Sequence, residues 1–202
     1  RDTHGTTGIA RLVAWLLRVS GKRVGLACAD GVFIDRRQTD TRSGVRFEVA
    51  QSVLMNRTIE AAVIESTAEA ILRDGLPFDR CRVAIVTDIS FGSRREALGA
   101  YHIGDDEQLF NVLRGPVDTV LADGLAVLNA DEPATLALGE LCDGDVVLYS
   151  RAASSAAVAN HRDHGGRAVL LDAGAVMLAQ GDVVQSLESL DVLVGQCPGV
   201  LP

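Results

Sequence analysis

The sequence predicts an α/β fold of three layers, in which helices cover a mostly parallel β-sheet, and three observations support this prediction. Short apolar runs alternate with segments of helical periodicity, as in sheets whose strands are joined by helices. The runs are nearly continuous in apolar residues, which is typical of strands buried on both faces. The chain has 202 residues, of which 48% are hydrophobic, enough for a sizeable core. We expect strands at 24–29, 61–64, 83–86, 125–128, 146–149 and 168–171.

A helix is predicted before the first strand, directly after a glycine-containing turn. Arg11 and Arg18 point away from its apolar face, which consists of Ile9, Leu12, Val13, Leu16 and Leu17. Asp30-Gly31 lies between apolar runs and predicts a tight turn.

A second turn, at residues 172–174, predicts a C-terminal β-hairpin that joins 168–171 to 176–178. The sequence has no internal repeat and no linker, so we expect a single domain over residues 1–202.

Composition excludes several classes of partner. The net charge of -8 and the pI near 4.9 lack the basic character of a nucleic-acid-binding protein, so no nucleic acid partner is expected. No apolar run reaches the length of about 18 residues that spans a bilayer, so no membrane partner is expected. The four cysteines are far apart and form no metal-binding pair, which fits reduced thiols in a cytoplasmic protein.

Residues 3–8, Thr-His-Gly-Thr-Thr-Gly, have the character of a phosphate-binding loop that leads into a helix. In such loops a lysine bridges the β and γ phosphates, and the following Ser or Thr binds Mg²⁺. Here Thr6 occupies the lysine position and Thr7 the metal position. Only two residues precede Thr3, where a strand is expected, and the segment 196–202 contains no capping element. We therefore expect the chain to be part of a longer multidomain protein.

Six segments, in one order along the chain, resemble the Mur-ligase-like ATP-binding domain of cyanophycin synthetases. The first combines the loop with the start of the helix, and one near the end contains His161 and His164. Together they cover nearly the whole chain, at residues 3–12, 30–35, 61–66, 75–81, 129–133 and 161–168.

This resemblance implies an α/β fold like that of the P-loop central domain of Mur ligases, and an ATP-dependent ligation. ATP phosphorylates a carboxylate, and an amine then attacks the acyl phosphate to form an amide. In cyanophycin synthetases such a domain adds arginine to an aspartate polymer with Mg²⁺, beside an ATP-grasp domain of which no segment is visible here. The implied cofactors are ATP and Mg²⁺, and the implied partner is an acidic peptide or polymer substrate. A homo-oligomer or flanking ligase domains are the further partners that the resemblance allows.

The resemblance also assigns roles to particular residues. Gly5, Thr6 and Thr7 correspond to the phosphate loop, and Thr7 and Glu65 to the Mg²⁺ ligands. For both metal ligands a structural alternative stays open. Thr7 is equally compatible with a cap of the first helix, and Glu65 with a solvated strand-end acid or helix cap.

On the nucleoside side, Asn129 corresponds to a residue that meets adenine, and Asp131 to one that meets the ribose hydroxyls. The alternative is that both form a turn that caps the helix opening at Glu132-Pro133. We weigh the two interpretations equally.

The chain departs from the family pattern at five places, and the losses of the phosphate lysine, the metal histidine and the carbamylated lysine all affect phosphoryl transfer. Besides Thr6, the aligned residues differ where the family has an asparagine, an Asp-His pair, a lysine that is often carbamylated, and a run of glycines. These positions are Asp88, Gly92-Ser93, Leu113 beside Arg114, and Ala68-Glu69-Ala70. Loss of one preorganised donor costs on the order of 10²-fold in rate, so we expect an eroded site. The two hypotheses are a weakened ligase and an inactive pseudo-ligase that serves as a scaffold or interaction module.

Two further groups have simple structural interpretations. His161 and His164 share a helical face, but without a third ligand in the spacing they are expected at a solvated helix end. The acidic run 104–107 is expected to be a loop that leads into a helix N-terminus.

Overall fold

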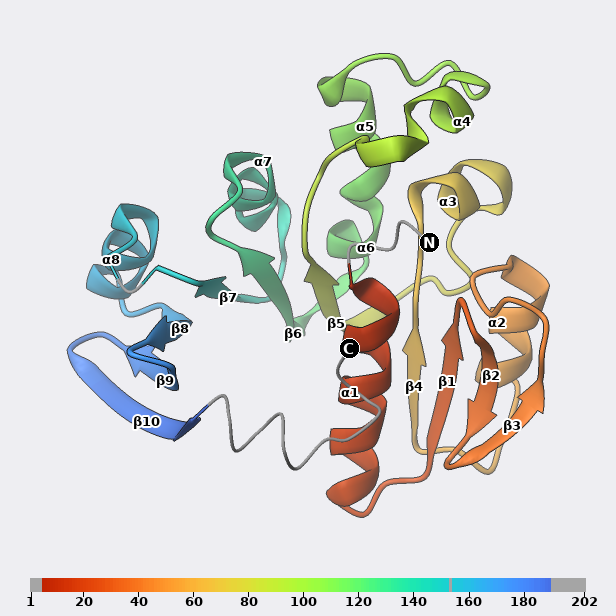
Figure 1. The fold of residues 1–202 in the computed structure, drawn as a ribbon, viewed down its shortest axis with the longest axis horizontal. Helices are drawn as coiled ribbons and strands as arrows, with labels where there is room; N and C mark the ends of the chain where they lie inside the picture. Colours follow the sequence, from red (N-terminus) through yellow and green to blue (C-terminus); the bar gives the residue numbers. More distant parts are fainter. Residues whose placement is uncertain (1–4, 153, 190–202) are drawn as a thin grey trace. The chain divides into compact units, whose positions relative to one another are not determined.

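A computed structural model describes residues 5–152 and 154–189 of the chain. The described residues divide into two compact units. The first unit contains residues 5–79 and 92–104, and the second contains residues 80–91, 105–152 and 154–189. Figure 1 shows the elements of both units.

The first unit is built on a four-stranded sheet in the order β3-β2-β1-β4. β1 pairs in parallel with β4 and antiparallel with β2, and β2 pairs antiparallel with β3. The strands are β1 (Val24–Cys28), β2 (Gly31–Ile34), β3 (Arg37–Asp40) and β4 (Ala61–Ile64). The helices are α1 (Thr6–Val19), α2 (Phe47–Leu54), α3 (Ala68–Asp74), the 3₁₀ turn η1 (Gly92–Arg94) and α4 (Arg95–Gly99).

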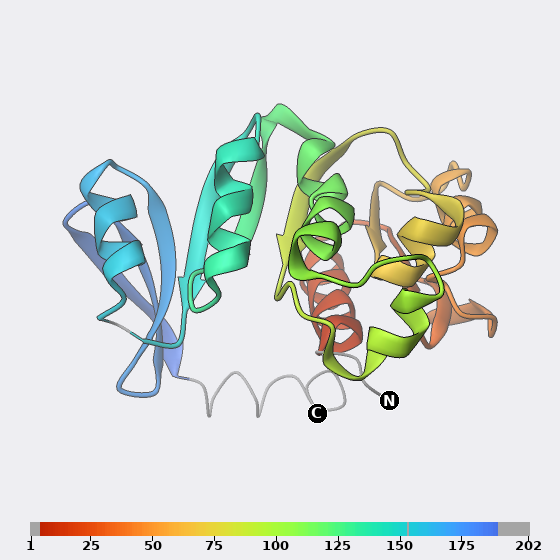
Figure 2. The same cartoon turned by 90° about the horizontal axis from the view of Figure 1, so that it is seen from above.

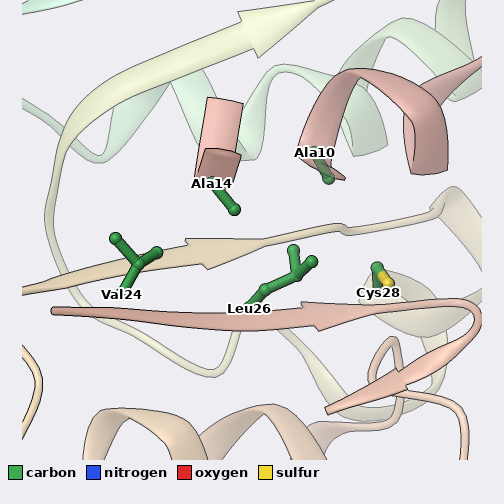
Figure 3. Close-up of a cluster of buried hydrophobic side chains, with 5 residues drawn as sticks. All are labelled: Ala10, Ala14, Val24, Leu26 and Cys28. Carbon is green, nitrogen blue, oxygen red and sulfur yellow. The ribbon is translucent and has the colours of Figure 1, made fainter. Parts of the chain in front are cut away.

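β1 is buried along its whole length because a helix covers each of its faces. Its side chains alternate between the two faces, as the pleat requires. On one face Val24, Leu26 and Cys28 pack against Ala10 and Ala14 of α1 (Figure 3). On the other face Ala27 packs in a cluster with Val32 of β2 and with α2, whose buried residues are Val49, Ala50 and Val53. The expected layering of helix, sheet and helix is thus present in this unit.

The helical segment after the glycine turn is confirmed, but the residues it buries differ from the apolar face of the sequence. Ala10 and Ala14 are the buried residues of α1, whereas the side chain of Leu16 is 51% exposed. Alanine lets the helix axis approach the strand closely, and larger side chains at these positions would hold the helix further from β1. A hydrophobicity pattern gives alanine little weight, so it favours the neighbouring leucines.

The second unit is built on a six-stranded sheet in the order β10-β9-β8-β7-β6-β5. β5 to β8 are parallel, and β8, β9 and β10 pair antiparallel. The strands are β5 (Cys81–Val86), β6 (Val120–Asn129), β7 (Asp145–Ser150), β8 (Arg167–Asp172), β9 (Ala175–Gln180) and β10 (Val183–Ser189). The helices are α5 (Asp106–Leu113), α6 (Gly115–Asp118), α7 (Pro133–Ala137), the 3₁₀ turn η2 (Leu138–Leu141) and α8 (Ala156–Asp163).

In this unit α7 connects β6 to β7 and α8 connects β7 to β8, and both helices lie on the same side of the sheet (Figure 2). Right-handed crossovers between parallel strands put the helices there. The mixed α/β class is confirmed, and all six predicted strands are present. The strands form two hydrogen-bonded sheets, one in each unit. The antiparallel pairs lie at one end of each sheet, β3-β2-β1 in the first unit and β8-β9-β10 in the second.

The predicted C-terminal hairpin is confirmed as β8 and β9. Its two-residue turn has positive φ at Ala173 (47°) and Gly174 (79°), the conformation of a type I′ hairpin turn. β10 extends the hairpin by one strand that the sequence did not predict. Its residues are largely exposed, so they show no continuous apolar run. Among the described helices, none is both long and apolar enough to cross a membrane.

Candidate functional site

In the first unit the loop before α1 reaches the carboxyl end of β4. Gly5 precedes α1 with φ at 73°, a left-handed conformation that glycine adopts without steric cost. Glu65 directly follows β4, and its backbone N–H donates to the carbonyl of Ala27 in β1 (2.8 Å). The parallel pairing of β1 with β4 therefore places Glu65 beside the end of β1.

The structure brings Thr6, Thr7 and Glu65 into direct contact. The hydroxyl of Thr6 donates to Glu65 Oε1 at 2.8 Å. The hydroxyl of Thr7 lies 2.9 Å from Oε1 and 3.0 Å from Oε2. The backbone N–H of Ala29, just after β1, donates to Oε2 at 2.7 Å. We refer to Thr6, Thr7, Ala29 and Glu65 as the threonine–glutamate cluster.

The carboxylate of this cluster is buried and satisfied by neutral donors. Glu65 is only 5% exposed, and burial of a charge is costly unless it is hydrogen-bonded. Two hydroxyls and one backbone N–H supply those bonds, without a positive charge among them. The N-terminus of α1 adds a favourable partial charge, because Thr6 and Thr7 are its first two residues.

Both structural alternatives for these residues are wrong. The residue that caps α1 is Gly5, which has no side chain, and the hydroxyl of Thr7 is directed to Glu65 instead of its own helix. Glu65 is buried, so it is not a solvated strand-end acid. The cap of the next helix, α3, is Thr67, whose hydroxyl accepts from the N–H of Ala70 at 3.2 Å.

The cluster has the donor chemistry of a magnesium site. A threonine hydroxyl and a carboxylate are hard oxygen ligands, and Mg²⁺ commonly takes one or two protein ligands while keeping several waters. Thr7 Oγ1 and the Glu65 carboxylate lie within 3.0 Å of each other, so one cation could contact both. Across residues 5–152 and 154–189 no group of three or more His, Cys, Asp and Glu side chains forms an alternative centre.

Cys28 and Asp30 border the cluster without joining it. Burial raises the pKa of the Cys28 thiol, and the negative charge of Glu65 adds to this effect. Asp30 pairs with Arg11 of α1 at 3.1 Å on the surface. Among the residues that the structure describes, Arg11 is thus the arginine that makes a contact beside the cluster, and its partner is Asp30.

In the second unit Asn129 ends β6 and its side chain ties two strands together. Its amide Nδ2 donates to the carbonyl of Thr87, which follows β5, at 2.8 Å. Its Oδ1 accepts from the N–H of Asp131 at 3.0 Å, which closes an Asx turn. The carbonyl of Asn129 also accepts from the hydroxyl of Thr135 in α7.

Asp131 is held by the end of β7. The hydroxyl of Ser150 donates to Oδ1 at 2.5 Å, and the N–H of Arg151 donates to Oδ2 at 3.1 Å. The Ser150 hydrogen bond, followed by the contacts of Arg151, keeps the pKa of Asp131 below its usual range. The turn interpretation of Asn129 and Asp131 is therefore confirmed, but neither side chain caps α7. The residue at that cap is Glu132, which makes no side-chain cap hydrogen bond.

The positions that depart from the family pattern also have internal partners. Asp88 accepts from the hydroxyls of Thr87 (2.9 Å) and Ser90 (2.7 Å). Arg114, beside Leu113, forms a surface ion pair with Asp118 at 2.8 Å. The remaining departures lie in helical elements of the first unit, with Gly92-Ser93 in η1 and Ala68-Glu69-Ala70 at the start of α3.

Of the two histidines, His164 matches its interpretation, because it is exposed at the end of α8 with Nδ1 2.8 Å from the carbonyl of Asn160. His161 does not, because it is half-buried and its Nε2 lies 3.2 Å from the carbonyl of Val146 in β7. Asp105 caps α5 and accepts from the N–H of Gln108 at 2.8 Å, as expected for the acidic run. Of the cysteines, Cys28, Cys81 and Cys142 are free thiols, and Cys197 lies outside the described residues.

Sequence comparison identifies relatives of this chain. No family model matches it. Cyanophycin synthetase of Crocosphaera subtropica (strain ATCC 51142 / BH68) is 34% identical over 186 residues, which is 92% of this chain and 21% of the relative. Cyanophycin synthetase of Synechocystis sp. (strain ATCC 27184 / PCC 6803 / Kazusa) is 29% identical over 200 residues, 99% of this chain and 22% of the relative. This chain is a homologue of one segment of cyanophycin synthetase. It spans about a fifth of the length of these relatives.

Solved structures show that this cyanophycin synthetase homologue shares the fold of Mur ligases. A UDP-N-acetylmuramoyl-L-alanyl-D-glutamate–2,6-diaminopimelate ligase matches with a TM-score of 0.66 at 18% identity, over 93% of this chain and 37% of that one. The UDP-N-acetylmuramate:L-alanyl-gamma-D-glutamyl-meso-diaminopimelate ligase from Neisseria meningitides matches with a TM-score of 0.52 at 19% identity, over 90% and 51%. The chain thus has the fold of a part of the Mur ligases.

Sequence reasoning found the acid and both threonines of the cluster but missed its backbone donor. Ala29 carries no functional group on its side chain, and only the parallel register of β1 and β4 places its N–H at Glu65. It also missed Ser150 and Arg151 as the partners of Asp131, because they lie about 20 residues away in the sequence. In both cases the sequence contains no local signal for the contact.

Proposed function

We propose that this chain is the nucleotide-binding part of a cyanophycin-synthetase-like ligase in which phosphoryl transfer is impaired. The observation that carries the proposal is the contact of Thr6 with Glu65. By resemblance Thr6 stands where a lysine would bridge the phosphates of ATP, and its hydroxyl instead donates to the buried carboxylate at 2.8 Å. The position has lost its charge and is used for an internal hydrogen bond.

The retained part of the site is the magnesium pair. Thr7 and Glu65 would hold Mg²⁺, which when bound neutralises charge on the phosphates of ATP. The N-terminus of α1, preceded by Gly5, offers backbone N–H groups to an anion. In the second unit, Asn129 corresponds by resemblance to a residue that meets adenine, and Asp131 to one that meets the ribose hydroxyls. We therefore expect weak binding of MgATP.

The charge balance explains why transfer should be slow. A phosphoryl group in flight carries negative charge that a preorganised cation must offset. With Thr6 in place of the lysine, the described residues of the loop, 5–8, supply only neutral donors, and Thr6 contacts the negative charge of Glu65. The proposal also includes a substrate class, which the homology favours. It is an acidic peptide or polymer together with an amine.

A second candidate function is an inactive scaffold or interaction module that contacts flanking ligase domains in a longer protein. It is favoured because the carboxylates of Glu65 and Asp131 already accept hydrogen bonds from groups of the protein. Glu65 accepts from three donors, and Asp131 accepts from Ser150 and Arg151. A ligand would have to replace or share these hydrogen bonds, and each bond to a charged group contributes about 1.5–3 kcal/mol.

Calorimetric titration with MgATP and with a non-hydrolysable analogue separates the two candidates. For the wild-type chain we expect saturable binding only in the millimolar range. Thr6→Lys should tighten binding about tenfold or more, since a lysine adds a charge-assisted bond to phosphate. Thr6→Met is the matched control, because it has similar length and no charge, and it should bind like the wild type.

The alternative outcomes are equally informative. Micromolar affinity of the wild type together with turnover in a ligase assay with aspartate polymer and arginine would overturn the impaired-site proposal. A flat titration for wild type and Thr6→Lys, with both proteins folded by circular dichroism, would favour the scaffold.

A further inference from the structure

The charges of this acidic chain are unevenly distributed. The net charge is -8, yet the first unit contains slightly more Lys and Arg than Asp and Glu, so the negative charge resides in the second unit. Within the first unit, basic side chains concentrate at one place. We call this surface the arginine-rich end, and it consists of Arg18, Lys22, Arg23, Arg36, Arg37 and Arg57.

Asp35 links three of the segments that form the arginine-rich end. It lies in the tight turn between β2 and β3 with φ at 54°. Arg18 of α1 donates to its carbonyl at 3.4 Å, and Arg23, just before β1, lies 4.0 Å from its carboxylate. Its Oδ1 also accepts from the N–H of Val24 at 3.0 Å. The arginines at positions 36 and 37 therefore directly follow a residue that contacts the start of β1.

Glu60 links the fourth segment, the loop between α2 and β4. The N–H of Arg23 donates to Glu60 Oε2 at 2.9 Å, and the N–H of Glu60 donates to the carbonyl of Arg23 at 2.8 Å. Arg57 lies in this loop three residues before Glu60. In Figure 1 the end of α1, the starts of β1 and β4 and the β2–β3 turn share the lower edge of the first unit.

This surface thus contains six basic side chains and the two carboxylates of Asp35 and Glu60. Lys22, Arg23, Arg36, Arg37 and Arg57 are all exposed. Exposed aliphatic side chains accompany them, because Val19 at the end of α1 is 65% exposed and Met55 at the end of α2 is 74% exposed. Such an excess of like charge attracts and orients an anionic partner.

The arginine-rich end is separate from the threonine–glutamate cluster. It lies at the amino ends of β1 and β4, and the cluster lies at their carboxyl ends. A strand of five residues spans roughly 16 Å, so a ligand at one end does not contact the other.

We propose that the arginine-rich end docks an acidic polypeptide segment. Arginine presents a planar fork of donors that binds carboxylates in a bidentate manner, and the aliphatic Val19 and Met55 suit the methylene groups of glutamate or aspartate side chains. One feature favours a peptide over a nucleic acid. No aromatic side chain among these residues offers a stacking platform for bases. The proposal does not depend on nucleotide binding.

Fluorescence anisotropy with a labelled oligoglutamate peptide tests the proposal on the full chain. We expect saturable binding at low salt that weakens as salt rises, because exposed charges are screened. The variant Lys22→Gln/Arg36→Gln/Arg37→Gln should bind about tenfold more weakly, which equals about 1.4 kcal/mol.

The matched control is Arg46→Gln/Arg80→Gln/Arg82→Gln, which removes the same charge from exposed positions outside the arginine-rich end. It should keep wild-type affinity within about twofold, because electrostatic effects of remote surface charges are screened. Equal weakening by both variants, or no saturable binding by the wild type, would overturn the proposal. It would also be overturned if a labelled oligonucleotide of equal length bound more tightly than the peptide.

Discussion

Replacing Glu65 with alanine removes the acceptor that joins α1 to the ends of β1 and β4. The side chain is 5% exposed and accepts from Thr6, Thr7 and Ala29 at distances between 2.7 and 3.0 Å. We expect Glu65→Ala to lower the free energy of unfolding of the first unit. The two hydroxyls can turn to other acceptors or to water, but the N–H of Ala29 stays beside the strand end.

The magnitude follows from two opposing contributions. Three donors to a charged acceptor contribute about 1.5–3 kcal/mol each. Burial of the carboxylate costs several kcal/mol, and the mutation removes this cost. The net loss should therefore be about 2–4 kcal/mol. Glu65→Gln keeps the shape and one acceptor oxygen, so its loss should be roughly half as large.

Urea unfolding followed by the fluorescence of Trp15 measures this loss. Trp15 is the single tryptophan of the chain and lies in α1, the helix that the cluster holds. With a slope near 2 kcal/mol per molar urea, Glu65→Ala should shift the midpoint by about 1–2 M. Glu96→Ala, at an exposed position of α4, is the control and should shift it little.

A double-mutant cycle with Thr7→Val isolates the contact itself. The coupling energy between Glu65 and Thr7 should be about 1–2 kcal/mol, since they share two short contacts. If Glu65→Ala is as stable as the wild type, or more stable, the cost of burying the carboxylate exceeds what the donors contribute. The expectation that the hydrogen bonds of the threonine–glutamate cluster stabilise the first unit would then be wrong.

Two other predictions concern packing and titration. Gly44→Ala should destabilise the chain by about 1–3 kcal/mol in the same urea assay, because a Cβ there would lie 2.5 Å from a backbone nitrogen of β1. Gly99→Ala is the control, with no atom within 4 Å of the added Cβ, and a loss as large as that of Gly44→Ala would contradict the packing explanation. Burial, with smaller contributions from Asp88 and Asp131, raises the pKa of Tyr149 to about 12. The buried neutral phenol of Tyr149 therefore makes its full contribution to the free energy of unfolding below the unfolded pKa of about 10. This contribution is lost as the pH rises through about 12. An absorbance titration should show a step near pH 12 that Tyr149→Phe removes, and a step unchanged by this substitution would refute the assignment.

The sequence predicted what depends on local patterns. The continuous apolar runs located the parallel strands, because burial on both faces leaves no polar positions. The run 172–174 located the C-terminal hairpin, because its turn requires positive φ at two successive residues. The spacing of the glycines and threonines before α1 located the loop, and the order of six segments identified the relationship to cyanophycin synthetase.

Only the tertiary structure decided how the side chains are used. Which face of α1 is buried depends on how closely β1 approaches, and the helix packs through Ala10 and Ala14. Whether Thr6 faces a phosphate or a protein group depends on where β4 ends, and it ends one residue before Glu65. The partners of Asp131 come from the next parallel strand. Periodicity and turn chemistry act over a few residues, so the sequence shows them directly. These contacts join residues about 10 to 60 positions apart, and whether such residues meet depends on how the helices and strands pack.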